Sequence, residues 1–594
     1  MLKKLDAETV VVILLCGALL ISWNYIFGPS GLDWMPKQQT KTTVASTAEK
    51  QSPSLLNATP SPSIEPKNTP PISLAQETLS LSKPSTEKPS LPFVDMPDVK
   101  ISNAVMDILL NPSLGQISSI DLKNFLTRDK KHNVFLNKDA SPGALSVTFP
   151  RTELVLIDTN IESLDNKSFV LRRKFSMPDA AVICLKQSWK LSDNYVIAYS
   201  IDCLNESGKE IVLPEMLVCA GAMPPVKYLA GDSVLVSESH GIDRCMASND
   251  AIIETRAVDG KFEERATQDN PVKWIGVSNK YFSCVLKPSL PFPDGNISKR
   301  INKTATPPQS ETKEDYFIVY TSGCVKNIVL PPHSAKTWSF SYYTGPKSIL
   351  LLKEFDPQAP FIMHLAWKYI DTVSQWLLYG LIFLKDIAGS YGMAIILLTL
   401  IVKLVFWPIT HKSNQSMKKM QKIQPMIAEL REKYKDDKQK LNTKLMELYK
   451  KEKINPLGGC LPILLQIPVF IALYWTLDGA IELRHTHFLW ANDLTLPDTV
   501  FTIGWLFNLP INPWAIMMAA TMFVQQKMTP TAMDPVQEKM MLMMPIIMLF
   551  FLYNLPSGLT LYWTVSQIIS IGQLVVNKYF DKAENQQKQN LKTA

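Results

Sequence analysis

The sequence predicts a multi-domain membrane protein: an N-terminal transmembrane anchor, an outer antiparallel β-sandwich and a C-terminal α-helical membrane core of five helices. Long apolar runs at both ends of the chain predict the membrane segments. Period-two alternation between them predicts the sandwich. The mean hydropathy of +0.02 over 594 residues is too low for a wholly embedded protein, so the chain is a mosaic.

Residues 1–28 predict the anchor. The apolar run Val10–Gly28 is long enough to cross a bilayer, and Lys3 and Lys4 before it place the amino terminus inside. A cleaved signal peptide is the alternative, although no small-x-small cleavage site follows the run. Residues 29–97 predict a disordered linker, because 36–97 contain 11 Pro, 10 Ser and 8 Thr and cannot bury enough apolar surface to fold.

Residues 98–350 predict the β-domain. Tyr195, Ile197 and Tyr199 alternate with their neighbours, as do Trp338 and Phe340, which is typical of antiparallel strands with one buried face. Six of the eight cysteines lie here, at Cys184, Cys203, Cys219, Cys245, Cys284 and Cys324. An exported domain permits disulfides, but buried free thiols fit the pattern nearly as well.

Residues 351–390 predict an amphipathic helix on the outer membrane surface. Charged and polar residues interrupt Phe361–Ala388, and its longest clean apolar stretch, Trp376–Leu384, is too short to cross. The charge of the next loop supports this choice. Thr410–Asn455 holds 13 basic and 6 acidic residues, net +7, and belongs inside by the positive-inside rule. A further crossing would place this loop outside.

Residues 391–578 predict the five-helix core, and 579–594 a cytoplasmic tail. The expected crossings are Tyr391–Ile409, Pro456–Leu483, Pro513–Met528, Met540–Leu555 and Leu559–Val576. With the anchor the count is six, which leaves both termini in the cytoplasm. Apolar residues at three- and four-residue steps predict a helical hairpin over 410–455, interrupted at Asp436-Asp437.

Lys403 is the most informative residue, because an ammonium inside a membrane helix costs about 2.5–3.5 kcal/mol unless it faces protein or water. Its side chain could instead snorkel toward the membrane surface. Other polar residues lie within the expected crossings and could line a wet, cationic groove with Lys403 or simply bond helices together. The candidate groove residues are Lys403, Thr399, Gln466, Gln526, Trp563, Ser566, Gln567 and Ser570.

Signals for an enzyme are weak, since the sequence has no G-x-x-x-x-G-K-[ST], H-E-x-x-H or G-x-S-x-G motif. His485 and His487 lack further metal ligands nearby, so no metal or other cofactor is expected. The basic loop could dock on ribosomal RNA or merely enforce topology. The candidate docking residues are Lys418, Lys419, Lys422 and Arg431.

Several strings closely resemble the YidC membrane-protein insertases of Gram-negative bacteria, within the YidC/Oxa/Alb family. They are T-L-I-V-K-L-V-F-W-P-I-T at 399–410, N-P-L-G-G-C-L-P-I-L-L-Q-I-P-V-F-I-A-L-Y at 455–474, Q-K-M-T-P at 526–530 and L-P-S-G-L-T-L-Y-W at 555–563. The outer domain matches more loosely, through 276–282 and Tyr343-x-Gly345-Pro346-Lys347. The resemblance implies a periplasmic β-supersandwich without catalysis and a groove open to the cytoplasm and to lipid.

The same resemblance implies that the cation of the second membrane helix attracts acidic or polar stretches of a substrate. Lys403 occupies that position, where the usual residue is Arg, so the charge is kept and the bidentate fork is lost. The expected activity is insertion and folding of inner-membrane proteins, alone or with the Sec translocon. The expected partners are nascent inner-membrane proteins, the Sec translocon, the ribosome and the lipid bilayer.

Two alternatives belong to other classes of protein. A membrane-anchored periplasmic carbohydrate-modifying or carbohydrate-binding protein would use the outer domain. A small-solute transporter ordinarily shows internal repeats, which this sequence lacks.

Overall fold

The structure of the chain is a computed structural model. It describes residues 96–593, apart from 128–129, 131, 139–141, 224–241, 248–251, 256–264, 267–270, 306–313, 364–367, 436, 453–460, 504–508 and 530–534. The predicted anchor over 1–28 and all of the predicted linker except residues 96 and 97 lie outside the described residues.

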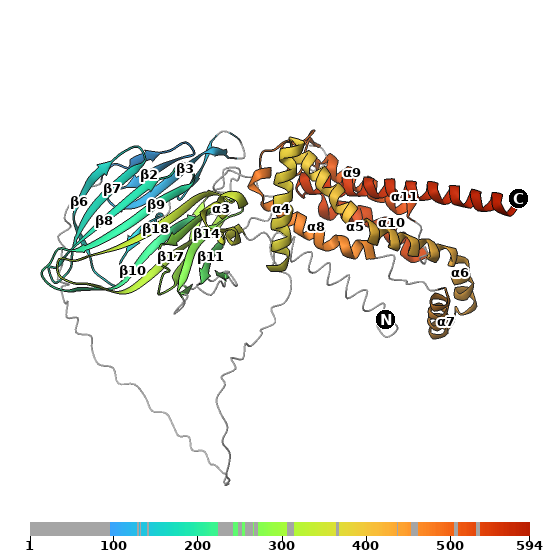
Figure 1. The fold of residues 1–594 in the computed structure, drawn as a ribbon, viewed down its shortest axis with the longest axis horizontal. Coiled ribbons are helices and arrows are strands. Elements are labelled where there is room, and N and C mark those ends of the chain that lie inside the picture. The colour runs from blue at the N-terminus through green and yellow to red at the C-terminus, as the bar shows by residue number, and fades with distance from the viewer. Residues whose placement is uncertain are drawn as a thin grey trace, which may run out of the picture. The chain divides into compact units, whose positions relative to one another are not determined.

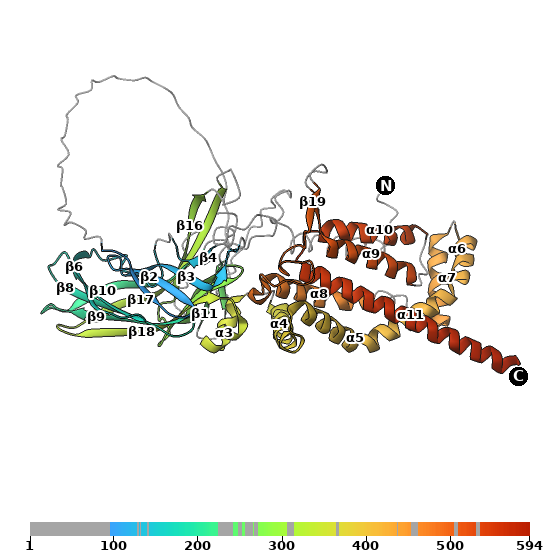
Figure 2. The same cartoon turned by 90° about the horizontal axis from the view of Figure 1, so that it is seen from above.

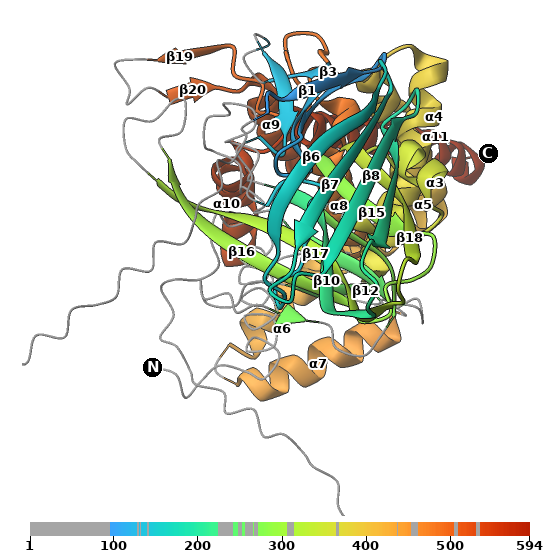
Figure 3. The same ribbon diagram turned by 90° about the vertical axis from the view of Figure 1, so that its left-hand side faces the viewer.

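The β-domain is built from three antiparallel sheets, and Figure 3 shows several strands of the largest lying side by side. This nine-stranded sheet has the order β12 (Ile252–Thr255), β11 (Ile242–Ala247), β14 (Val272–Ser278), β15 (Phe282–Pro288), β18 (Ala335–Pro346), β9 (Val196–Asn205), β8 (Val182–Leu191), β7 (Ser168–Ser176) and β6 (Val155–Leu164).

The five-stranded sheet has the order β13 (Arg265–Ala266), β16 (Asn296–Ala305), β17 (Glu314–Leu330), β10 (Ile211–Met223) and β5 (Val147–Thr148). The four-stranded sheet has the order β1 (Val99–Ser102), β2 (Met106–Asn111), β3 (Gln116–Leu126) and β4 (Asn133–Leu136). The predicted alternation is confirmed in β9, where Ile197, Tyr199 and Ile201 are buried and Ala198 is exposed.

Aromatic rings form the centre of the β-domain. Trp189 of β8 contacts Phe169 of β7 and Tyr199 of β9, with ring centroids 5.4 and 5.3 Å apart. Tyr199 stacks on Phe340 of β18, which stacks on Phe292 at 5.9 Å. These large buried side chains supply much of the apolar area that holds the sandwich together.

One glycine is required by this packing. Gly323 of β17 lies over the Phe292 ring, and a Cβ added there would stand 2.2 Å from ring atom Cζ. Any side chain at this position would have to displace a ring that is itself buried.

The six cysteines of the β-domain, Cys184 through Cys324, are all buried, and none of them forms a disulfide bond in the described part of the chain. Of the two readings that the sequence left open, the structure therefore has the buried thiols. Burial raises the pKa of Cys219 to about 11, although its contacts with Gly221, Ser322 and Ser146 oppose that shift. A thiol so protonated and enclosed is a poor nucleophile.

Helices make up most of the described residues that follow the β-domain (Figure 1). They are α3 (Ile349–Phe355), the 3₁₀ helix η2 (Ala359–Met363), α4 (Lys368–Ala388), α5 (Tyr391–Lys422), α6 (Gln424–Lys433), α7 (Lys438–Lys451), α8 (Leu461–Gly479), the 3₁₀ helix η4 (Ile481–Leu483), α9 (Pro513–Met528), α10 (Pro535–Leu552) and α11 (Ser557–Thr593). The short strands β19 (Phe501–Ile503) and β20 (Leu509–Ile511) form a separate hairpin.

Two of the described helical stretches, Tyr391–Lys422 and Ser557–Tyr579, are long and apolar enough to cross a bilayer. α5 is longer than the predicted crossing. Ser390 caps its amino end by accepting from Met393 N, and the helix continues through Pro408 until Ile423. Pro425, the second residue of α6, has no backbone N–H to donate to the carbonyl of Gln421, as a continuous helix would require, and this explains the break at Ile423 that the sequence analysis missed.

α6 and α7 form the predicted helical hairpin (Figure 2). Ile423, Ile427 and Leu448 make its small core, against which Met420, Leu430, Leu445 and Tyr449 pack. The hairpin is therefore a folded unit with an apolar interior and charged outer faces.

α4 runs crosswise to α5 and α11 in Figure 1 and packs on α5 and α8. Its buried face includes Leu378 and Leu381, and Ser374 Oγ donates to the carbonyl of Ala472 in α8 at 3.1 Å. The opposite face is apolar as well, since Trp376 is 74% exposed and Phe383 65% exposed. That exposed face suits contact with lipid rather than water.

The loop between α8 and α9 covers the helix ends farthest from the α6–α7 hairpin. Leu494 and Leu496 carbonyls accept from Gly558 N and Ser557 N at the start of α11, at 2.9 and 2.7 Å. Asp498 Oδ2 accepts from Trp490 Nε1 and Trp514 N, at 2.8 and 2.7 Å. We call residues 481–512, outside 504–508, the end cap.

The two outer-domain strings that carried the family resemblance meet each other. Lys347 N donates to Tyr281 O at 2.7 Å, and Lys347 Nζ to Asn279 O at 3.0 Å. Beside them, Lys280 Nζ pairs with Asp478 Oδ1 of α8 at 2.6 Å, with only 12% and 14% of these side chains exposed. These strings therefore bring a buried ion pair to the end of a core helix.

Candidate functional site

Lys403 lies on α5 and reaches α11. Its Nζ donates to Ser570 Oγ at 2.9 Å, and Ser570 Oγ in turn donates to the carbonyl of Ser566 one turn earlier, at 2.9 Å. None of the ion pairs among the described residues includes Lys403. The amine is thus held by a hydroxyl group, which leaves its positive charge unneutralised.

Lys403 and Ser570 lie at similar depths in their helices. Lys403 is twelve residues from Tyr391 and Ser570 thirteen from Ser557, or about 18 and 20 Å at the usual helical rise. Since a bilayer's hydrocarbon is about 30 Å thick, both positions are inside it when the helices cross. The hydrogen bond thus joins the two helices far from the amino end of either one.

Thr399 lies on the same face of α5 as Lys403 but makes a different hydrogen bond. Its hydroxyl donates to the carbonyl of Ile395 in its own helix at 2.6 Å. Gln466 of α8 is held elsewhere, as its Nε2 donates to the hydroxyl of Tyr562 at 2.6 Å. The sequence analysis missed Tyr562. Tyr562 directly precedes Trp563 in a segment rich in polar residues, and this position could have marked it as a candidate.

Trp563 packs edge-on against Phe470 of α8, with centroids 4.6 Å apart. Gln526 of α9 has a buried amide oxygen without a hydrogen-bond partner, and Gln567 is half-buried on α11. Of the eight groove candidates, the structure joins Lys403, Ser570 and Ser566 through two successive hydrogen bonds. The other five lie on α5, α8, α9 and α11.

The four docking candidates differ in exposure. Lys419 and Lys422, at the end of α5, are exposed, whereas Arg431 of α6 is half-buried. Lys418 is half-buried too and lines a pocket between helices. Only the first two present their charge fully to solvent.

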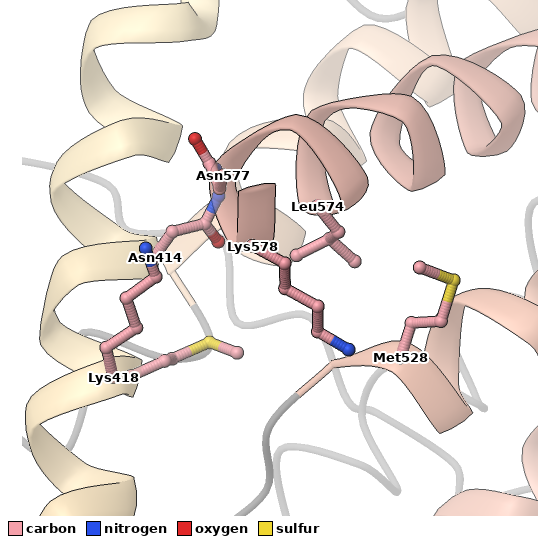
Figure 4. Close-up of a pocket in the computed structure, with 7 residues that line it drawn as sticks. Asn414, Lys418, Met528, Leu574, Asn577 and Lys578 are labelled. Carbon is pink, nitrogen blue, oxygen red and sulfur yellow. The ribbon is translucent and has the colours of Figure 1, made fainter. Parts of the chain in front are cut away.

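The pocket lies between the last turns of α5, the end of α9 and the middle of α11 (Figure 4). Its lining combines two lysines and two asparagines with apolar side chains: Asn414, Met417, Lys418, Met528, Leu574, Asn577 and Lys578. We call it the α5–α11 pocket. Its volume is about 30 Å³.

His485 lies in the end cap with Nδ1 3.6 Å from Asp493 Oδ2. Among the described residues, no group of three His, Cys, Asp or Glu side chains could hold a metal ion.

Comparison with known proteins covers both halves of the chain. Residues 383–584 match the family described as 60Kd inner membrane protein, and residues 98–370 match the family described as YidC periplasmic domain. The "Membrane protein insertase YidC" of Pelobacter propionicus is 33% identical over 553 residues, covering 88% of this chain and 96% of that protein. The chain belongs to the YidC family of membrane protein insertases.

A second YidC insertase, from a Geobacter species, is 47% identical over 253 residues, covering 42% of this chain and 45% of that protein. A solved structure described as active YidC insertase with its first transmembrane domain resolved is 19% identical, covers 82% of this chain and 95% of that one, and gives a TM-score of 0.34. Family membership confirms the predicted combination of a periplasmic β-sandwich domain and a helical carboxyl-terminal region.

Proposed function

We propose that this chain inserts nascent inner-membrane proteins into the bilayer and helps them fold, through a hydrophilic, cationic groove open to the cytoplasm and to lipid. The observation that carries the proposal is Lys403 at mid-helix, bonded to Ser570 and without a carboxylate partner among the described residues. Such a charge attracts the acidic or polar flank of a substrate while its apolar segment enters lipid.

The end cap supports a groove open on one side only. It ties the amino ends of α9 and α11 together through Asp498, Leu494 and Leu496. A polar flank of a substrate that reaches Lys403 therefore meets the hydrogen-bonded end cap beyond it. The free energy needed to move that flank across the membrane comes from the transfer of about 20 apolar substrate residues into lipid.

The snorkelling alternative makes a different prediction about Lys403. A lysine that only reaches for the membrane surface would be replaceable without loss of insertion, whereas Nζ lies on Ser570 at mid-helix. The test is insertion of substrates with acidic outer tails by Lys403→Arg, Lys403→Ala and Lys403→Glu, with Lys385→Ala on α4 as the control for losing an exposed lysine.

Insertion should be retained by Lys403→Arg and by the control, fall with Lys403→Ala and fall furthest with Lys403→Glu, because the tail is then repelled. Membrane abundance must be measured beside insertion, since a buried charge also affects folding. Normal insertion by Lys403→Ala at normal abundance, with several substrates, would remove Lys403 from the site.

We also propose six crossings, including an anchor over 1–28, with both termini in the cytoplasm. The net charge of +7 over 410–455 supports this topology. Single cysteines at Gln439 and Thr486, in a cysteine-free background, test it with an impermeant thiol reagent on cells whose outer membrane is permeabilised. Thr486 should react and Gln439 should not, and the reverse pattern would contradict the topology.

For the ribosome we propose contact through Lys419 and Lys422, which are exposed at the start of the hairpin. Replacing both by Gln should weaken ribosome co-sedimentation and flatten its salt dependence. Unchanged sedimentation at low salt would leave the hairpin a topology signal only. Action alone or together with the Sec translocon is proposed on the family resemblance, and co-purification of the full chain with the translocon tests it.

A further inference from the structure

The β19–β20 hairpin presents an apolar face to its surroundings. Its register pairs Phe501 with Ile511 and Ile503 with Leu509, and directly opposed residues of an antiparallel pair point to the same side. Phe501 is 57% exposed and Leu509 39% exposed. A hairpin of two strands is marginally stable at best in water, so an exposed apolar face on one indicates a surface that contacts something other than water.

Polar contacts fix the base of the β19–β20 hairpin to the helices. Thr499 Oγ1 donates to Asn512 Oδ1 at 2.7 Å, and Asn512 Nδ2 donates to the carbonyl of Tyr553, directly after α10, at 2.9 Å. The Tyr553 hydroxyl donates to the carbonyl of Pro510. These bonds set the direction in which the hairpin leaves the core, while the described strands themselves carry no charged side chain.

The β19–β20 hairpin runs across the helices rather than along them. In Figure 2 β19 projects sideways from α9 and α10, crosswise to their length. In Figure 3 both strands point away from α9, on the side of the core opposite α4. Where α9 crosses the bilayer, an element that lies crosswise to it extends along the plane of the membrane.

The length of α9 places this element at the edge of the hydrocarbon. Lys527 is fourteen residues from Pro513, the first residue of α9, or about 21 Å at the usual helical rise. A lysine near the end of a crossing helix reaches the membrane surface, and the hydrocarbon is about 30 Å thick. The outer end of α9 therefore does not rise above the hydrocarbon, and β20 ends only two residues before it. This step rests on the proposed crossings.

We propose that the β19–β20 hairpin is a membrane-surface anchor, with its apolar face between the headgroups and the first acyl carbons of the outer leaflet. Lipid is favoured as the occupant because exposed apolar side chains continue along the chain from Leu509 to Ile516 and Met517 in the first turns of α9. The hairpin and the exposed apolar face of α4 then hold the core at a fixed depth from opposite sides.

Depth-dependent fluorescence quenching of the full chain in phosphatidylcholine vesicles tests the anchor. The fluorescent residue dansylalanine replaces Phe501, and in two control proteins it replaces Gly208 of the β-domain or Ile546 of α10. The vesicles carry a lipid with a nitroxide spin label near either the glycerol end or the methyl end of an acyl chain. Gly208 has nothing within 4 Å of an added Cβ, and Ile546 is 60% exposed, so both positions accommodate the probe.

The probe at position 501 should lose more fluorescence to the shallow spin label than to the deep one. At position 208 it should lose almost none to either label, and at position 546 it should lose more to the deep one. No quenching at 501 with the expected quenching at 546 would overturn the proposal, because the hairpin would then lie in water or be covered by protein, such as a second copy of the chain. Stronger quenching at 501 by the deep label would overturn it too. No quenching at 546 would contradict the proposed crossings, and the anchor with them.

A charge on the apolar face gives a second test. Leu509→Asp should reduce the quenching of the probe at position 501, because a carboxylate favours water over the membrane interface. The matched control is Leu290→Asp, which places the same charge on an exposed leucine just after β15 and should leave the quenching unchanged. Equal quenching in the two variants would overturn the proposal.

Discussion

Asp478→Ala should destabilise the folded chain strongly, because it leaves the buried Lys280 amine without its partner. The two charged atoms are 2.6 Å apart. Burial lowers the pKa of Lys280, but Asp478 and Tyr281 more than reverse this, so its pKa lies above the usual value and the amine stays charged. Removing one member of a buried pair costs about 3–5 kcal/mol, because the remaining charge is uncompensated.

The pair as a whole contributes much less than that. Attraction at 2.6 Å amounts to about 6 kcal/mol at an effective dielectric constant of about 20. Desolvating two ions costs several kcal/mol each, so the two effects nearly cancel. Lys280→Met/Asp478→Leu, which fills the same space with apolar atoms, should therefore lie within about 1.5 kcal/mol of the parent.

The measurement is the thermal midpoint of the full chain in detergent, for both single variants and the double variant. A loss of about 3 kcal/mol corresponds to a fall of roughly 6–12 °C in a domain of this size. Lys287→Ala is the matched control: its pair with Asp356 is also 2.6 Å long, but Lys287 is 40% exposed, so the loss should stay below about 1 kcal/mol. The reasoning would be refuted if Asp478→Ala lowered the thermal midpoint no more than the control did. It would also be refuted if the double variant lowered the midpoint by the sum of the two single effects.

The remaining predictions concern the β-domain. Gly323→Ala should cost about 1–3 kcal/mol, because its Cβ would meet the Phe292 ring, while Gly208→Ala, with nothing within 4 Å, should leave the thermal midpoint unchanged; equal midpoints for the two variants would contradict this. Burial raises the pKa of Asp107, but bonds to two lysines lower it on balance to about 2. A carboxyl depressed in the folded state stabilises it above the unfolded pKa of about 3.9 and loses this contribution as pH falls through about 2. Asp107→Asn should therefore flatten the acid side of the stability curve by about 1 kcal/mol after solvent screening, and an unaltered curve would count against the pair.

Local pattern predicted much of the fold. Alternation in β9 and β18 marks which side chains face the core, since successive residues of a strand point to opposite faces. The start of α9 at Pro513 and its end at Met528 coincide with the predicted segment. The order of strands in the nine-stranded sheet was beyond reach, because β18 pairs with β9 across more than a hundred residues.

In the candidate site, too, the sequence predicted local features but not contacts between residues far apart in the chain. Lys403 stands out in sequence because its charge falls in an apolar run, but its partner Ser570 is 167 residues away. Thr399 was predicted beside Lys403 from helical spacing, yet its hydroxyl bonds within its own helix, as threonine readily does. The partner of Gln466 could not be named, since any buried hydroxyl of a neighbouring helix would satisfy the same amide.

Because α5 is one continuous helix, a movement of its end at the hairpin also moves Lys403. The helix runs for 32 residues, about 48 Å, with Lys403 near its middle and the hairpin beyond its far end. A tilt of one degree about its amino end displaces the far end by about 0.8 Å and Lys403 by about 0.3 Å. Pro408, between Lys403 and the end of the helix, removes one backbone hydrogen-bond donor, so the helix bends most easily there. A ligand that displaces the hairpin therefore tilts the helix that carries Lys403, and bending at Pro408 reduces the displacement of Lys403.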